Sequence, residues 1–210
     1  MKPVLSLLAD IANGIFAVLL AGYFSATEIL WWHFLIGIPL AMLPDLDALP
    51  ELIKRGRVGS SAEHTYDHRS GLHFPILFLI VGSILTYLSP FFGLLFLIAT
   101  TLHFINDLYG TGWGIALLWP FSNTRFKLLS RRVNWAKKQL KATGAWDKVL
   151  PEEKRLRLVV SWKEEELLSY IEKWGVDDWI DLVYCHRNWI SATEYFLFSL
   201  AVILLLLNLV

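Results

Sequence analysis

Cysteine and charge are both scarce in this chain of 210 residues. Cys185 is the single cysteine, so no disulfide forms within the chain, and nothing in the sequence favours an oxidising compartment. Charged residues make up 18% of the sequence, compared with roughly 25% in an average soluble protein. Because the formal net charge is zero, no basic field points to a nucleic-acid partner. The composition also excludes a disordered chain, a collagen and a small disulfide-rich domain.

Apolar residues, by contrast, are abundant and come in long runs. They make up 55% of the chain and give it a mean hydropathy of +0.48. The runs are Val4–Phe24, Ile29–Leu43, Phe74–Leu88, Phe91–Leu108 and Trp189–Val210. A helix needs about 20 residues to cross a bilayer, so the second and third runs either extend into polar flanks or are partly buried in the bundle. We therefore predict an all-α fold, a polytopic bundle of about five transmembrane helices.

The runs divide the chain into three parts. Residues 1–123 form a predicted four-helix membrane domain, and residues 189–210 form the last transmembrane helix. Between them, residues 124–188 are predicted to be a helical cytoplasmic appendage. Its stretch 125–141 mixes basic and apolar residues, which suits either a helix lying on anionic lipid headgroups or a solvated helix packed on its neighbour. From Pro151 the charge turns acidic, and a proline followed by glutamates favours a helix start there.

Ionisable side chains are costly at membrane depth, so each one there needs a physical reason. Here they gather on one side of the membrane, where the chain enters or leaves the predicted spans. They come from the motif PDLD, from the segment EHTYDHRSGLHF and from the end of the fourth run. The candidates are Asp45, Asp47, His64, His68, His73, His103 and Asp107, with Asp10 about two helical turns into the first run.

This set of imidazoles and carboxylates has the chemistry of a metal site. Such groups bind zinc, manganese and iron(II), and His103 and Asp107 are four residues apart on one helix face. The candidates outnumber the about three protein ligands of one catalytic ion, so we predict two divalent ions, zinc or manganese. Taken singly, the His103–Asp107 pair is more simply a hydrogen-bonded pair at a helix end, and PDLD is more simply a turn. Their occurrence at one depth favours the metal site.

The ordered motifs resemble the membrane-bound metal-dependent hydrolase family of bacteria and archaea, described as LexA-binding inner-membrane hydrolases. PDLD, HRSGLH and HFINDLYGTGWGIALLWPF carry the resemblance, which covers residues 1 to about 122 and leaves out the appendage and the last span. That family is distantly similar to zinc phospholipases C and single-strand nucleases, helical enzymes that use several zinc ions on phosphodiesters. The resemblance implies an inner-membrane location. It also implies metal-binding and catalytic roles for Asp45, Asp47, His68, His73, His103 and Asp107.

The sequence departs from the family pattern at two places. The family tends to carry a histidine in its first helix where Asp10 stands here, so Asp10 takes the place of a ligand. Hydroxyl residues that usually flank the second histidine of the HRSGLH motif are replaced by Leu72 and Phe74. These changes affect the metal preference and the contacts around His73.

Hydrolysis of a phosphoester, of a lipid or a lipid-linked substrate, is the function that these features predict. Arg69 would stabilise the phosphate charge through its guanidinium, or else only set the topology. Asp67, or whichever carboxylate is not a ligand, would act as general base, or else Asp67 orients an imidazole or is merely solvated. The rivals are a metal or proton transporter, and a non-catalytic membrane adaptor with a structural metal. The sequence does not set the oligomeric state.

The distribution of basic residues predicts the topology. If the five runs cross the bilayer in turn, all 19 lysines and arginines fall on one side, which is then cytoplasmic. We expect an inside N-terminus and an outside C-terminus. A protease added to intact spheroplasts should remove a tag fused after Val210, and a protected tag would contradict the assignment.

Overall fold

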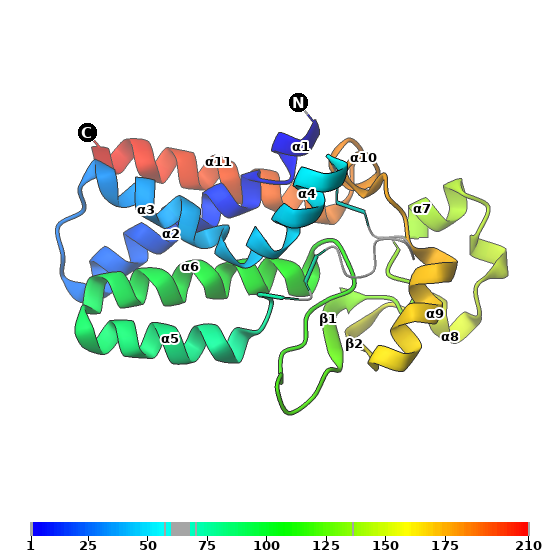
Figure 1. Cartoon of the computed structure of the whole chain (residues 1–210). Helices are drawn as coiled ribbons and strands as arrows, with labels where there is room; N and C mark the ends of the chain where they lie inside the picture. Colours follow the sequence, from blue (N-terminus) through cyan, green and yellow to red (C-terminus); the bar gives the residue numbers. More distant parts are fainter. Residues whose placement is uncertain (1, 57, 60–67, 70, 136, 210) are drawn as a thin grey trace.

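The fold is mainly helical, with five apolar helices side by side and a smaller mixed unit at one end of them (Figure 1). The structure is a computed structural model of the whole chain, and it describes residues 2–56, 58–59, 68–69, 71–135 and 137–209. The apolar helices are α2 (Leu8–Ser25), α3 (Trp31–Ala41), α5 (Pro75–Leu88), α6 (Pro90–Tyr109) and α11 (Trp189–Leu209).

Three of these helices, α2, α6 and α11, are long and apolar enough to cross a membrane. The other two, α3 and α5, are apolar but shorter. The prediction of a mainly helical fold with several candidate membrane spans is therefore confirmed, whereas five crossings remain a prediction. Helix α5 ends at Leu88, and Pro90 begins α6 after the single residue Ser89. Proline fits well in the first turn of a helix, because no backbone N–H donor is needed there.

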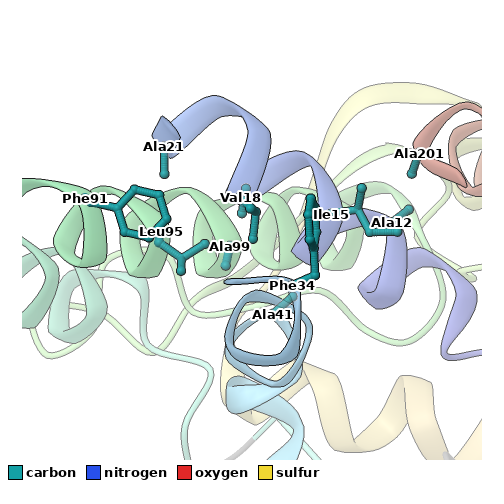
Figure 2. Close-up of a cluster of buried hydrophobic side chains, with 11 residues drawn as sticks. Ala12, Ile15, Val18, Ala21, Phe34, Ala41, Phe91, Leu95, Ala99 and Ala201 are labelled. Atoms are coloured by element: carbon teal, nitrogen blue, oxygen red, sulfur yellow. The ribbon is translucent and has the colours of Figure 1, made fainter. Parts of the chain in front are cut away.

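Small side chains hold the centre of the bundle together. Helix α2 packs on α3, α6 and α11, and its contact surface is made largely of alanine and glycine. Figure 2 shows this core, in which Ile15 and Val18 of α2 face Leu95 and Ala99 of α6. At the crossing of α2 and α3, a side chain on Gly14 would collide with the backbone of Ile38. Such close approach favours helix association in lipid, because the burial of apolar surface contributes little to the association of helices there.

Short elements cover the end of the bundle that faces the mixed unit. They are α1 (Lys2–Leu5), the 3-10 helix η1 (Leu43–Ala48) and α4 (Leu49–Arg55). Pro44 lies in the first turn of η1 and Pro50 in the first turn of α4. Each proline therefore marks the start of a new helix after α3. These short helices carry the PDLD motif to the end of α6 (Figure 1).

The mixed unit has its own hydrophobic core around Trp162 and Leu140, both fully buried. Its strands β1 (Arg125–Ser130) and β2 (Arg157–Trp162) form an antiparallel pair in which Arg125 lies opposite Trp162. Its helices are α7 (Lys137–Ala142), η3 (Trp146–Lys148), α8 (Pro151–Lys154), α9 (Glu164–Trp174) and α10 (Trp179–Tyr184). The helix start expected at Pro151 is confirmed.

Two predictions for this region were wrong. The fold is not all-α, because β1 and β2 form a small sheet. The stretch 125–141 is not one amphipathic helix, since 125–130 is a strand and helix begins only at Lys137. The cause is non-local pairing: β1 completes its backbone hydrogen bonds with the β-branched segment of β2 about thirty residues away, which local periodicity does not reveal.

The crossing of α2 and α3 yields a stability prediction. We expect Gly14→Val to lower the stability of the purified protein by about 1–3 kcal/mol, because the added atoms overlap a helix backbone. The measurement is a thermal unfolding curve in detergent. Ser83→Thr, which adds one methyl group at an exposed position of α5, is the matched control. Equal melting of both variants would contradict the packing.

Candidate metal centre

The predicted site residues converge at the end of α6. His103 and Asp107 lie on its last turns, Asp45 and Asp47 on η1, His68 and His73 in the segment before α5, and Asp10 near the start of α2. His64 and Asp67, also candidates, lie outside the described residues. Segments far apart in the sequence thus place imidazoles and carboxylates around one point.

Four donor atoms occupy the centre of this cluster. Asp45 Oδ1 lies 3.2 Å from His103 Nε2 and 3.3 Å from His73 Nε2. Asp107 Oδ2 lies 3.2 Å from His73 Nε2 and 3.5 Å from His103 Nε2. The two Nε2 atoms are 3.4 Å apart. Asp45, His73 and His103 each offer one of these atoms to a candidate ligand group for one metal ion, and Asp107 lies against both imidazoles.

This arrangement fits a divalent ion. A tetrahedral ion with bonds of about 2.0–2.1 Å separates its ligands by roughly 3.3–3.4 Å, which matches the observed distances. Asp45 Oδ1 and Asp107 Oδ2 are also buried without a hydrogen-bond partner among the described residues. Buried carboxylate oxygens are normally satisfied, so these two atoms call for a cation or a proton between the four groups.

A second layer of carboxylates fixes the imidazole rings. His103 Nδ1 lies 2.8 Å from Asp10 Oδ1, and His73 Nδ1 lies 3.0 Å from Asp47 Oδ2. Each ring therefore donates from Nδ1 to a carboxylate and turns Nε2 towards the centre, which is the usual support of a metal-binding histidine. The backbone N–H groups of Gly71 and Leu72 donate to Asp47 at 3.1 and 3.2 Å.

Asp10 and Asp47 thus contact the rings and not the central point. For Asp10, both a ligand role and a contact through a ligand were open from the sequence, and the structure shows the contact with His103. Its side chain is buried in the bundle interior. A carboxylate in an apolar helix is expected there, because exposing it to lipid without a partner would cost free energy.

Arg69 is tied to Asp107. Its Nη2 pairs with Asp107 Oδ1, and its Nη1 donates to the carbonyl oxygen of Thr111 at 2.6 Å. A side chain at Gly112 would collide with this guanidinium, and Gly112 has a φ of 74°, a conformation that favours glycine. The guanidinium that the sequence assigns to a phosphate therefore contacts a carboxylate of the centre through Nη2 and a backbone carbonyl through Nη1.

The site favours positive charge at its middle. Burial alone would lower the pKa of His73, but the neighbouring carboxylates of Asp107, Asp45 and Asp47 outweigh it and raise that pKa to about 9. Burial alone would raise the pKa of the Asp47 carboxyl, but hydrogen bonds from His68 and His73 hold it below its usual range. The carboxylates therefore stabilise either a proton or a cation among the imidazoles.

A cavity of about 850 Å³ reaches the centre. The side chain of Asp45 is 33% exposed, whereas those of His73, His103 and Asp107 are nearly fully buried, so the cavity approaches from the side of Asp45. Glu194 of α11 also lines it. Sequence analysis missed this residue, although a carboxylate inside the last apolar run is the kind of signal that marks a functional position.

Comparison with known proteins shows the family of this chain. A sequence model of the YdjM inner membrane protein family matches residues 7–207. The chain belongs to the YdjM inner membrane protein family. The match includes the appendage and the last helix, so the family extends beyond the first 122 residues that the motifs suggested. Membership supports a location in the inner membrane and contact with the lipid bilayer. No curated protein and no solved structure matches this YdjM-family protein.

The Asp10–His103 contact predicts a graded effect on metal binding. We expect Asp10→Asn to weaken binding of Zn²⁺ or Mn²⁺ about 10- to 100-fold, since asparagine keeps an acceptor oxygen but loses the charge that strengthens the ligand. His103→Ala should abolish binding. Titration of the purified protein with metal measures both, and Ser25→Ala at the other end of α2 is the control. Unchanged affinity in Asp10→Asn would rule out the supporting role.

Proposed function

We propose that this protein is a metal-dependent hydrolase that cleaves a phosphoester at the cytoplasmic surface of the membrane. The observation that carries the proposal is the candidate ligand group of Asp45, His73 and His103, with Asp107 against both imidazoles, at the wall of a large cavity. A cavity at that position gives a substrate access to the ion. A purely structural metal needs no such access.

One divalent ion fits the donors better than two. Nitrogen and oxygen ligands without sulfur suit zinc or manganese. A second group of candidate ligands, Asp47, His68 and His73, shares His73 with the first. His73 would then have to bind one ion through each ring nitrogen, although its Nδ1 is engaged by Asp47. A bound divalent ion supplies Lewis-acid chemistry, polarising a phosphoryl oxygen and acidifying a water.

His68 is the residue best placed to move a proton. Its Nδ1 lies 3.0 Å from Asp47 Oδ1, and its Nε2 lies 3.3 Å from Asp45 Oδ1 at the open side of the centre. The carboxylate of Asp47 orients the ring, an arrangement that suits a general base or acid. We therefore assign the proton transfer to His68 Nε2 in place of Asp67.

The cavity favours a lipid or lipid-linked substrate. Its volume of about 850 Å³ lies within the range of roughly 300–1,000 Å³ that holds ligands of moderate size. Leu46, Leu49 and Leu52 line it and remain more than 40% exposed, so apolar side chains form part of its rim. An acyl chain matches that rim, while the phosphoester reaches the polar centre.

A transporter is less well supported. Asp10, near the start of α2, and His103 and Asp107, near the end of α6, all lie at the same end of the bundle, next to η1. The other half of α6, from Pro90 to Ala99, carries no ionisable side chain. A path for ions needs polar groups along the whole span.

The test is turnover of phosphoesters by the purified full chain. We expect hydrolysis of phospholipids in mixed micelles to stop after metal removal by a chelator and to return with Zn²⁺ or Mn²⁺. His68→Asn should lower kcat about 10²- to 10⁴-fold without loss of bound metal. His186→Asn, a histidine exchange at an exposed position, is the matched control.

Two results would contradict the proposal. One is a metal-loaded protein that cleaves none of the phospholipids or generic phosphoesters offered. The other is a His68→Asn variant that turns over substrate as fast as the unchanged protein, which would remove His68 from the reaction.

A further inference from the structure

The last membrane helix contributes a buried carboxylate to the cavity of the metal centre. Glu194 of α11 is 2% exposed and lines the same cavity as Asp107 and Asp45. Its carboxylate oxygen Oε2 is buried without a hydrogen-bond partner among the described residues. This oxygen is therefore left to bind something else.

A buried amide donor on α6 lines the same cavity. Asn106 accepts a hydrogen bond from the Tyr109 hydroxyl at 2.9 Å through Oδ1, which fixes the orientation of the amide. Its Nδ2 has no partner within the described part of the chain, and it is buried. A Cβ atom on Gly110 would lie 3.5 Å from Glu194 Oε1, so the carboxylate of Glu194 lies against the last turn of α6, which also carries Asn106.

An unpaired acceptor and an unpaired donor in one cavity point to a ligand that satisfies both. Buried polar atoms are almost always paired in folded proteins, and an unpaired carboxylate within a membrane span is costly. A hydroxyl group can donate to Glu194 Oε2 and accept from Asn106 Nδ2. An ammonium group offers only donors, and a quaternary ammonium group offers neither.

We propose that Glu194 and Asn106 form a subsite for a hydroxyl group of the substrate's headgroup. The identity of this ligand as a substrate rests on the proposed function, whereas its binding does not. Asn106 and Glu194 line the same cavity as Asp107 and Asp45, so one headgroup can reach both the subsite and the metal centre. The substrate class is then a phosphoester lipid with a hydroxylated headgroup, such as glycerol or a sugar.

The test measures binding without turnover. Metal-free full-length protein in detergent is titrated with dihexanoyl phosphatidylglycerol, phosphatidylethanolamine or phosphatidylcholine, and the lipid-bound fraction is read by native mass spectrometry. We expect the unchanged protein to prefer phosphatidylglycerol. Glu194→Leu should reduce the affinity for that lipid about tenfold and leave the affinity for phosphatidylcholine unchanged. Ser199→Ala, at an exposed position of the same helix, is the control.

Two further variants separate the subsite from a structural role. Glu194→Gln should keep most of the preference, because its amide oxygen still accepts a hydrogen bond from a hydroxyl group. Asn106→Leu should lose the preference as Glu194→Leu does. If Glu194→Leu fails to fold, Asn106→Leu and Glu194→Gln still test the proposal.

The results that would refute the subsite differ from those that would refute the proposed hydrolase activity. Equal binding of phosphatidylglycerol and phosphatidylcholine by the unchanged protein would refute the subsite, as would an unaltered preference in Glu194→Leu. A preference for phosphatidylethanolamine that both Glu194 variants lose would indicate an ammonium site instead. A preference for phosphatidylglycerol in a protein that hydrolyses no lipid would support the subsite and refute the proposed reaction.

Discussion

The hydrogen bond from His103 to Asp10 is the contact on which the site and the bundle both depend. It joins α2 to α6 at a position where both side chains are buried. Because Nδ1 is engaged by the carboxylate, Nε2 must face the centre, where it lies close to Asp45, His73 and Asp107. The bond is possible only because small residues on α2 let the two helices approach, so packing and chemistry constrain each other here.

Polar contacts connect the candidate metal centre to the mixed unit. The loop that follows α6 carries the carbonyl of Thr111, which accepts from Arg69, and the carbonyl of Gly112, which accepts from the buried Lys127 of β1 at 2.8 Å. Burial and then the nearby Arg69 hold the pKa of Lys127 well below its usual range. The sheet is therefore attached to the loop that positions Arg69 on Asp107. The mixed unit forms a wall of the site and is more than an appendage to the membrane helices.

The candidate site and the apolar core occupy different parts of the bundle along the helices. The residues that line the cavity, including Asp45, His103 and Asp107, come from the end of the helices near the mixed unit and from the mixed unit itself. The rest of α2 and α6 is packed with alanine, leucine and phenylalanine. A centre near the membrane surface with an apolar rim is a physical reason for a substrate that is itself part of the membrane.

The sequence by itself determined the membrane class, the inventory of ionisable groups and the end of the bundle where they gather, because apolar run length and the cost of buried charge are local properties of the chain. It also indicated that His103 and Asp107 share a helix face. Only the tertiary structure decided which ring nitrogen faces the centre, since that choice depends on Asp10, 93 residues away from His103. The same holds for β1, whose partner strand is remote, and for Glu194, which joins the site because α11 packs against α2. Contacts between distant segments set orientation and pairing, and no local pattern encodes them.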